Sequence, residues 1–101
     1  MIEIHTKMLL DKVTGKDVKI ISRIKIGHKI VAKYDETIKQ INLDCLKPFV
    51  GTKVFIYDNN GKKYSHSAQI DSIDPGIDGT NEGYILNLGK VKNETEADVN
   101  A

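Results

Sequence analysis

The side chains best suited to bind a ligand are cations in the first third of the chain. They alternate along two β-rich runs, residues 18–26 and 28–34. Because side chains two residues apart in a strand point to the same face, this spacing predicts a basic surface. Such a surface attracts phosphate groups, and a tyrosine ring beside it can stack on a base. The predicted nucleic-acid-binding residues are Lys19, Arg23, Lys25, Lys29, Lys33 and Tyr34, with Tyr57 as a second candidate ring.

The distribution of charge along the chain supports this expectation. Residues 1–33 carry eight Lys or Arg and three Asp or Glu, whereas residues 71–101 carry two and seven. The net charge of +1 therefore hides a basic first third and an acidic last third. The competing interpretation is a solvated face, on which lysine keeps the protein soluble and discourages edge pairing.

A second candidate lies in the acidic segment 71–82. It places Asp first, Gly sixth and Glu last, as in a twelve-residue calcium loop of the EF-hand type. The third and fifth positions, which should supply oxygen ligands, are Ile73 and Pro75. A surface turn is therefore expected in place of a calcium site. In the alternative functional hypothesis, this segment binds a basic protein through Asp71, Asp74, Asp78 and Glu82.

Catalytic and metal-binding residues follow no recognisable spacing. His5, His28, His66 and Cys45 are scattered, and no serine stands in a nucleophile-elbow context. There is no phosphate-cradling glycine loop. The expectation is a protein that is not an enzyme and that needs neither a metal nor a cofactor.

Period-two alternation in short β-rich runs dominates the chain and predicts an all-β fold. Ile2, Ile4, Met8 and Leu10 share one phase, and the next run is expected to place Val18, Ile20, Ile24 and Ile26 on one face. Residues 53–70 predict a hairpin, because Asn60-Gly61 suits a tight turn between strands. Residues 84–88 predict a last strand.

Residues 37–47 fit two structures. Ile38, Ile41 and Cys45 fall at helical spacing, with Pro48 ending the helix, whereas alternation of Ile41 and Leu43 fits a strand. We favour the strand, paired as a hairpin with the one before it. The expected fold is an antiparallel meander of six or seven strands, closed into a small barrel. Residues 1–91 would form one domain, and 92–101 a disordered acidic tail.

Part of this pattern resembles a known architecture. Residues 46–88 contain Val54-Phe-Ile-Tyr57, Asn60-Gly61, Ala68-Gln-Ile70 and Tyr84-Ile-Leu-Asn-Leu88. Their order of strand, turn and bent strand resembles that of Sm-like and other SH3-like barrels. The resemblance is one of architecture and implies a small barrel. The short RNA-contacting signatures of Sm-like proteins have no residue-by-residue match here.

Two functional hypotheses follow. The first is a non-enzymatic β-barrel module that binds RNA or DNA through the basic face, led by backbone contacts. The second is a protein-binding adaptor or inhibitor that acts through its acidic loop and tail, a role that would suit a phage or other mobile element. A single cysteine and the absence of a signal-like start predict a cytoplasmic protein. The oligomeric state does not follow from the sequence.

Overall fold

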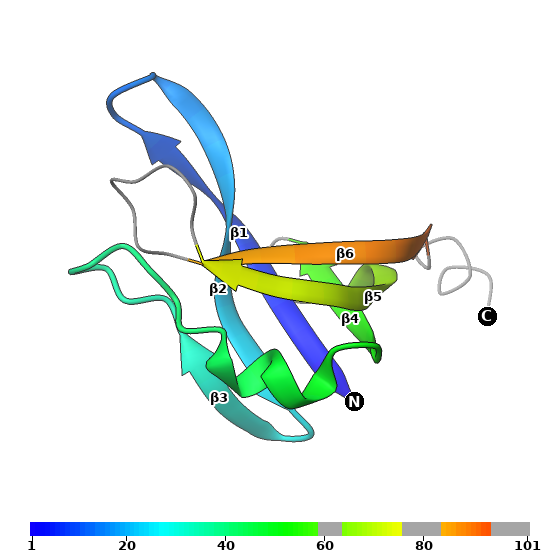
Figure 1. The fold of residues 1–101 in the computed structure, drawn as a ribbon. Helices are drawn as coiled ribbons and strands as arrows, with labels where there is room; N and C mark the ends of the chain where they lie inside the picture. The colour runs from blue at the N-terminus through cyan, green and yellow to red at the C-terminus, as the bar shows by residue number, and fades with distance from the viewer. Residues whose placement is uncertain (59–63, 76–83, 94–101) are drawn as a thin grey trace.

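The structure, a computed structural model, describes residues 1–58, 64–75 and 84–93 (Figure 1). These residues form six β-strands and one short 3-10 helix, so the predicted all-β class is confirmed. The elements are β1 (Ile2–Asp11), β2 (Lys16–Ile26), β3 (Lys29–Lys33), η1 (Asp44–Phe49), β4 (Lys53–Asp58), β5 (Tyr64–Pro75) and β6 (Tyr84–Asn93).

The strands form one sheet in the order β3-β2-β1-β4-β5-β6. Neighbouring strands are antiparallel except β1 and β4, which run parallel with Glu3 opposite Phe55 and Thr6 opposite Asp58. The predicted all-antiparallel meander is therefore wrong at this pair. A parallel pair needs a crossover connection, and residues 34–52 supply it by carrying the chain from β3 past β2 and β1.

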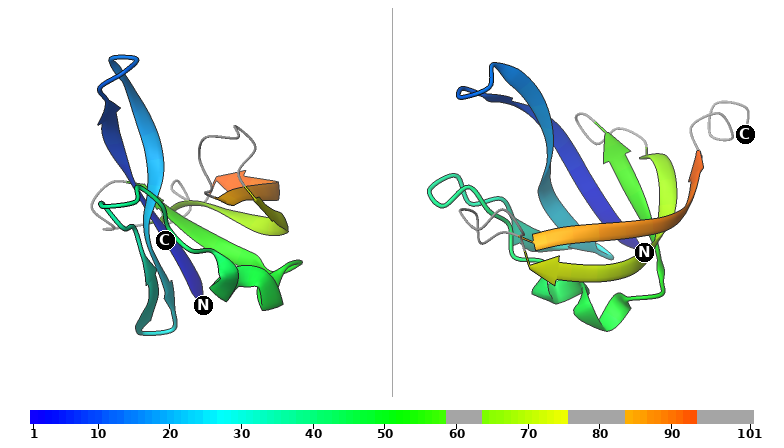
Figure 2. Two further views of the ribbon diagram at one scale, coloured as in Figure 1. Left: turned by 60° about the vertical axis from the view of Figure 1, so that its left-hand side comes forward. Right: turned by 45° about the horizontal axis from the view of Figure 1, so that its top comes forward.

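The sheet is strongly curved but does not close, so the predicted barrel is also wrong. The two ends of the sheet, β3 and β6, are edges that do not pair with each other. Figure 2 shows the β1–β2 pair and the β5–β6 pair running in different directions on either side of the sheet's centre. The helix η1 lies over the inside of this curve.

The core lies between η1 and the inner surface of the sheet. Ile4, Ile24 and Ile70 are almost completely buried, as are Leu43 and Leu46 from the η1 segment. Ile2, Val54 and Ile56 complete this cluster. We call the side of the sheet that carries these residues the core face, and the opposite side the outer face.

Residues 37–47 do not form the predicted strand. Gln40 makes a single bridge to Asp35, whose carboxylate accepts hydrogen bonds from the backbone N–H groups of Thr37 and Ile38. An Asx turn of this kind competes with regular pairing. A helix is present, but it begins at Asp44 and contains Pro48, so it also lies later than the helical alternative placed it.

The C-terminal strands are longer than predicted. The β4–β5 hairpin is confirmed, with Val54 opposite Ala68 and Ile56 opposite His66. β5 continues through Asp71 to Pro75, and β6 continues to Asn93, two residues past the expected end of the domain. The predicted Asn60-Gly61 turn and nearly all of the predicted tail lie outside the described residues.

We predict that Leu46→Ala lowers the free energy of unfolding by about 2–5 kcal/mol, because it empties space at the contact between η1 and the sheet. Urea unfolding followed by circular dichroism measures this change. Lys47→Ala, on the exposed side of the same turn, is the control and should change stability by less than about 0.5 kcal/mol. Equal losses in the two variants would contradict the position of η1.

Candidate nucleic-acid interface

A bulge in β2 decides which basic side chains share a face. His5 of β1 stands opposite Arg23 and the next residue, Thr6, stands opposite Ile21, so Ser22 is an extra residue. Its hydroxyl donates a hydrogen bond of 3.0 Å to the carbonyl of His5. Because an extra residue reverses the alternation, the side chains before and after Ser22 exchange faces.

The consequence is a split in the predicted basic face. Arg23 and Lys25, opposite His5 and Glu3, lie on the outer face, whereas Lys19 lies opposite Met8 on the side continuous with the core face. The prediction that Lys19 shares a face with Arg23 and Lys25 is wrong. The same reversal moves Val18 and Ile20 away from the face of Ile24 and Ile26.

A second irregularity places the lysines of β3. Ala32 stands opposite Ile24 and Ile30 opposite Lys25, which leaves Val31 as the extra residue. Lys33 stands opposite Arg23 and joins the outer face, but Lys29 stands opposite Ile26 on the other side. The structure thus gathers Arg23, Lys25 and Lys33 into one group, which we call the outer basic patch.

The outer basic patch contains an unfavourable like-charge pair. Arg23 and Lys33 are both exposed and directly opposite on neighbouring strands. Side chains in this position have Cβ atoms about 4.5–5.5 Å apart, and like charges there repel. Lys25 stands opposite Glu3, but that carboxylate is 2.9 Å from His5 Nε2. A bound anion between Arg23 and Lys33 would relieve the repulsion.

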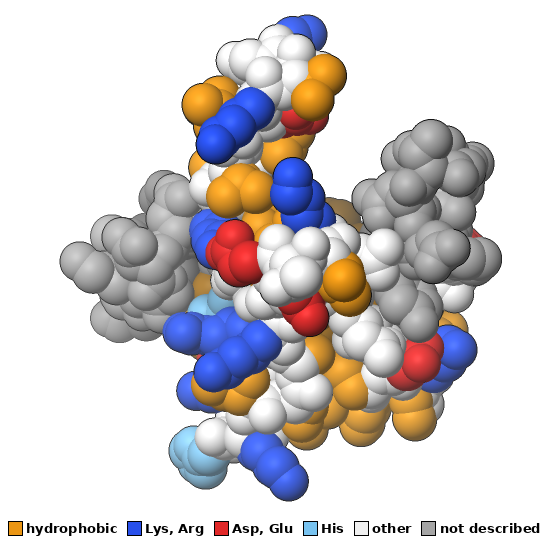
Figure 3. Space-filling model, turned by 90° about the vertical axis from the view of Figure 1, so that its left-hand side faces the viewer, with side chains coloured by type: hydrophobic (Ala, Val, Ile, Leu, Met, Phe, Trp, Pro, Cys, Tyr) orange, Lys and Arg blue, Asp and Glu red, His pale blue; other side chains and the backbone are white. Residues whose placement is uncertain are grey.

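The surroundings of the patch leave room for a ligand. Figure 3 views the side of the molecule that carries β3 and shows a compact group of Lys and Arg side chains below the β1–β2 hairpin, with acidic side chains beside it. An open hollow of about 380 Å³ follows β3 from Ile30 to Lys33. The edge strand is therefore accessible along the same residues that supply the charge.

Both candidate tyrosine rings already have neighbours. Lys7 Nζ lies 5.9 Å from the centre of the Tyr34 ring and 3.5 Å from Glu36 Oε1. Partial burial, and to a lesser degree the Glu36 carboxylate, raise the pKa of Tyr34. The Tyr57 ring stacks on His5, with ring centres 4.5 Å apart and planes inclined by 10°. Each ring offers at most one open side to a base.

The acidic segment does not form the predicted loop over its whole length. Asp71 and Asp74 belong to β5, and the Asp74 carboxylate accepts hydrogen bonds from Ser72 Oγ and Asn87 Nδ2. The Asp71 carboxylate lies against Gly89, so closely that a Cβ at this position would clash with it. Asp78 and Glu82 lie outside the described residues.

The histidines and the cysteine do not converge. Within the described ranges, no three His, Cys, Asp or Glu side chains form a group that could hold a metal ion. His5 is 6% exposed, and its Nδ1 has no hydrogen-bond partner among the residues that the structure describes. Cys45 sits in η1, partly buried against the core.

Two features of the structure were not predicted, a second basic group and an apolar arm. Lys53 of β4 and Lys90 and Lys92 of β6 line an open pocket of about 310 Å³. The Lys-x-Lys spacing after Leu88 could have indicated it, but the acidic character of this third of the chain masked the signal.

The apolar arm is the protruding end of the β1–β2 hairpin, residues 8–20. Its exposed apolar side chains are Met8, Leu10, Val13 and Val18.

The fold and the site define a small all-β domain with an open six-stranded sheet and two basic regions. No protein-family model matches the sequence, and neither a curated protein nor a solved structure is significantly similar to it. In the part of the chain that the structure describes, no helix has the length and hydrophobicity needed to cross a membrane.

We predict that Lys33→Glu raises the free energy of unfolding at low salt by about 0.2–1 kcal/mol, because it replaces repulsion from Arg23 with attraction. Urea unfolding at two salt concentrations measures the effect, which should shrink at high salt. Lys33→Gln removes only the repulsion, so its free energy of unfolding should lie between those of the wild type and Lys33→Glu. Destabilisation by Lys33→Glu at low salt would contradict the register of β2 and β3.

We also predict that Cys45 reacts slowly with alkylating reagents at neutral pH. Burial, followed by the nearby Asp44 carboxylate, raises the pKa of its thiol, while a backbone hydrogen bond partly opposes the shift. Since only the thiolate is nucleophilic, the rate should rise with pH to a midpoint above that of a free thiol. If Cys45 of the folded protein reacts at pH 7 as fast as Cys45 of the unfolded chain, the predicted rise in its pKa is wrong.

Proposed function

We propose that this protein is a non-enzymatic binding module that contacts nucleic acid through the outer basic patch. The observation that carries the proposal is the direct opposition of two exposed cations, Arg23 and Lys33, with Lys25 beside them. Their mutual repulsion is unfavourable for the folded protein alone and is relieved when a phosphate lies between them.

Recognition of this kind would be led by the phosphate backbone and tolerant of sequence. Lysine and arginine contacts to phosphate supply affinity without reading bases. Base stacking would add less, because Lys7 and His5 already take up part of the Tyr34 and Tyr57 rings. The open hollow beside β3 gives a strand of nucleic acid space to approach Lys33.

The rival hypothesis, a basic protein bound through acidic residues, has weaker support. Asp74 is engaged by Ser72 and Asn87, and Asp71 lies against the sheet at Gly89. Neither carboxylate belongs to a projecting loop. The predicted cytoplasmic location is independent of this choice and stays a prediction.

Charge reversal tests the proposal directly. Arg23→Glu combined with Lys25→Glu should abolish binding to a fluorescent single-stranded oligonucleotide, measured by anisotropy at low salt. For the wild-type protein, the logarithm of the binding constant should fall against the logarithm of salt concentration. The expected slope is about −2 if three phosphates are neutralised, at roughly 0.7 per phosphate on a single strand.

The matched control is Lys19→Glu combined with Lys29→Glu. It makes the same change of charge on β2 and the neighbouring strand β3, but on the other face of the sheet. Binding should weaken only slightly, through the change in overall charge. Equal losses in the two double variants would count against a localised patch, and retention of binding by the Arg23 and Lys25 variant would refute the proposal.

A further inference from the structure

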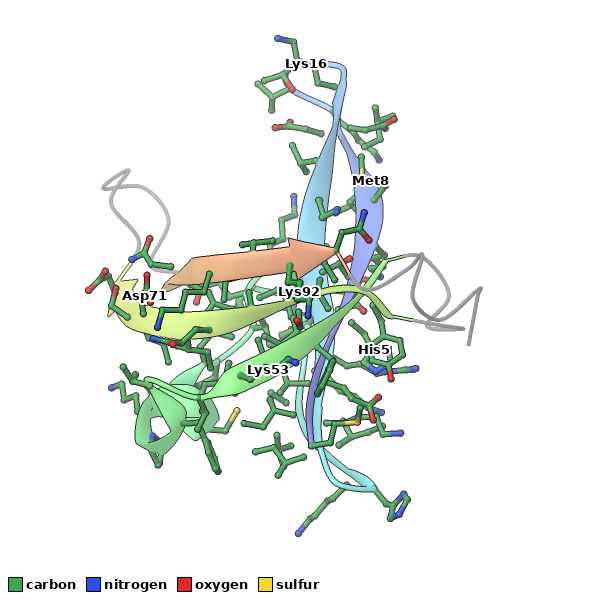
Figure 4. All side chains as sticks on the ribbon, turned by 90° about the vertical axis from the view of Figure 1, so that its right-hand side faces the viewer. His5, Met8, Lys16, Lys53, Asp71 and Lys92 are labelled. Carbon is green, nitrogen blue, oxygen red and sulfur yellow. The ribbon has the colours of Figure 1, made fainter. Side chains whose placement is uncertain are left out.

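A second basic site lies at the other end of the sheet, where β4, β5 and β6 meet. Register places Gln69 of β5 between Lys53 of β4 and Gly89 of β6. In the next row, Ser67 stands between Phe55 and Lys92. Lys53 and Lys92 are therefore diagonal neighbours across β5, both on the outer face. Figure 4 shows them near each other at the middle of the sheet.

A bulge in β6 adds a third cation. Lys92 stands opposite Ser67, and Gly89 stands opposite Gln69. Between these pairs β6 has two residues, Lys90 and Val91, where β5 has only Ala68. Lys90 has a φ of 49°, a left-handed conformation that non-glycine residues rarely adopt. The bulge puts Lys90 into the lining of the same pocket as Lys92. Strained backbone of this kind is often kept where a side chain must be aimed at a ligand.

The pocket has the composition of an anion site. Three lysines line it, together with Gly51, Gln69 and the buried residues Ser67 and Ala68. Its volume of about 310 Å³ is at the lower end of the range for ligand pockets, about 300–1,000 Å³. A small ligand fits better than a large apolar one. The Asp71 carboxylate lies against Gly89, the residue before Lys90.

We propose that the pocket formed by Lys53, Lys90 and Lys92 binds a phosphate group. Lysine ammonium groups bind phosphate as point charges that need no fixed bidentate geometry, so three flexible side chains can converge on one group. Ser67 and Gln69 contribute polar residues to the lining. The phosphate group comes either from a small phosphate ester or from a nucleic-acid backbone crossing the outer face. The site shares no residue with the outer basic patch and stands independently of it.

The test uses pyrophosphate as the probe and the full chain labelled for NMR. Saturable shifts are expected at Gly51, Gln69, Lys90 and Lys92. Lys90→Gly should weaken binding about tenfold, the size of one charge-assisted contact, while glycine accepts the positive φ and preserves the fold. Lys92→Gln provides a second variant with the same expected loss. Asp71→Asn should tighten binding.

The matched control is Lys39→Gly. Lys39 also has a positive φ, 56°, and loses the same charge, but it lies in the connection before η1 and outside the pocket. It should leave pyrophosphate binding within about twofold of the wild type. The absence of saturable shifts in the wild-type pocket, or equal weakening by Lys39→Gly and Lys90→Gly, would overturn the proposal.

A short oligothymidylate separates the two sources of the phosphate group. If Lys90→Gly weakens the binding of the oligonucleotide as well as that of pyrophosphate, the site holds backbone phosphate. If it weakens only the binding of pyrophosphate, the site takes a small phosphate ester. Either result supports the proposal. The Arg23→Glu and Lys25→Glu variant should still bind pyrophosphate. Loss of pyrophosphate binding in the pocket and loss of oligonucleotide binding at the outer basic patch can therefore be told apart.

Discussion

The parallel pairing of β1 with β4 is the constraint on which the structure depends. β1 pairs on both sides over the same residues, so Ile4 lies between Ile24 of β2 and Ile56 of β4, all on the core face. Without this pair the chain would be two separate antiparallel units, β1 to β3 and β4 to β6. The pair also sets the distance between the two basic regions, one on β2 and β3 and the other on β4 to β6. The crossover that permits it contains η1 and supplies Leu43 and Leu46 to the core.

Bulges then determine which charges act together. Extra residues at Ser22 and Val31 separate Arg23, Lys25 and Lys33 from Lys19 and Lys29. The bulge at Lys90 has the opposite effect, because it brings two lysines of β6 into one pocket. In each case a change of one residue in register moves charge between a solvent-facing and a core-facing side. The electrostatic character of the outer face is thus a product of irregular pairing.

The sequence was informative where a pattern is local. Alternation over residues 2–10 and 53–70 predicted strands that the structure confirms, because period two reports directly on strand faces. The parallel pair and the open edges could not be predicted, since they depend on contacts distant in sequence. The bulge at Ser22 leaves no clear local mark, so simple alternation placed Lys19 on the wrong face. A turn at residues 35–37 was expected as part of a hairpin, but the Asp35 carboxylate holds it as an Asx turn and only one bridge, to Gln40, follows it.

NMR mapping of a single-stranded oligonucleotide on the wild-type protein, at low and near-physiological salt, would locate the binding surface. We expect salt-sensitive shifts at the side chains of Arg23, Lys25 and Lys33, with much smaller ones at Lys19 and Lys29. No shifts at low salt, or shifts of equal size on both faces, would contradict the claim that bulged register builds a polyanion-binding surface.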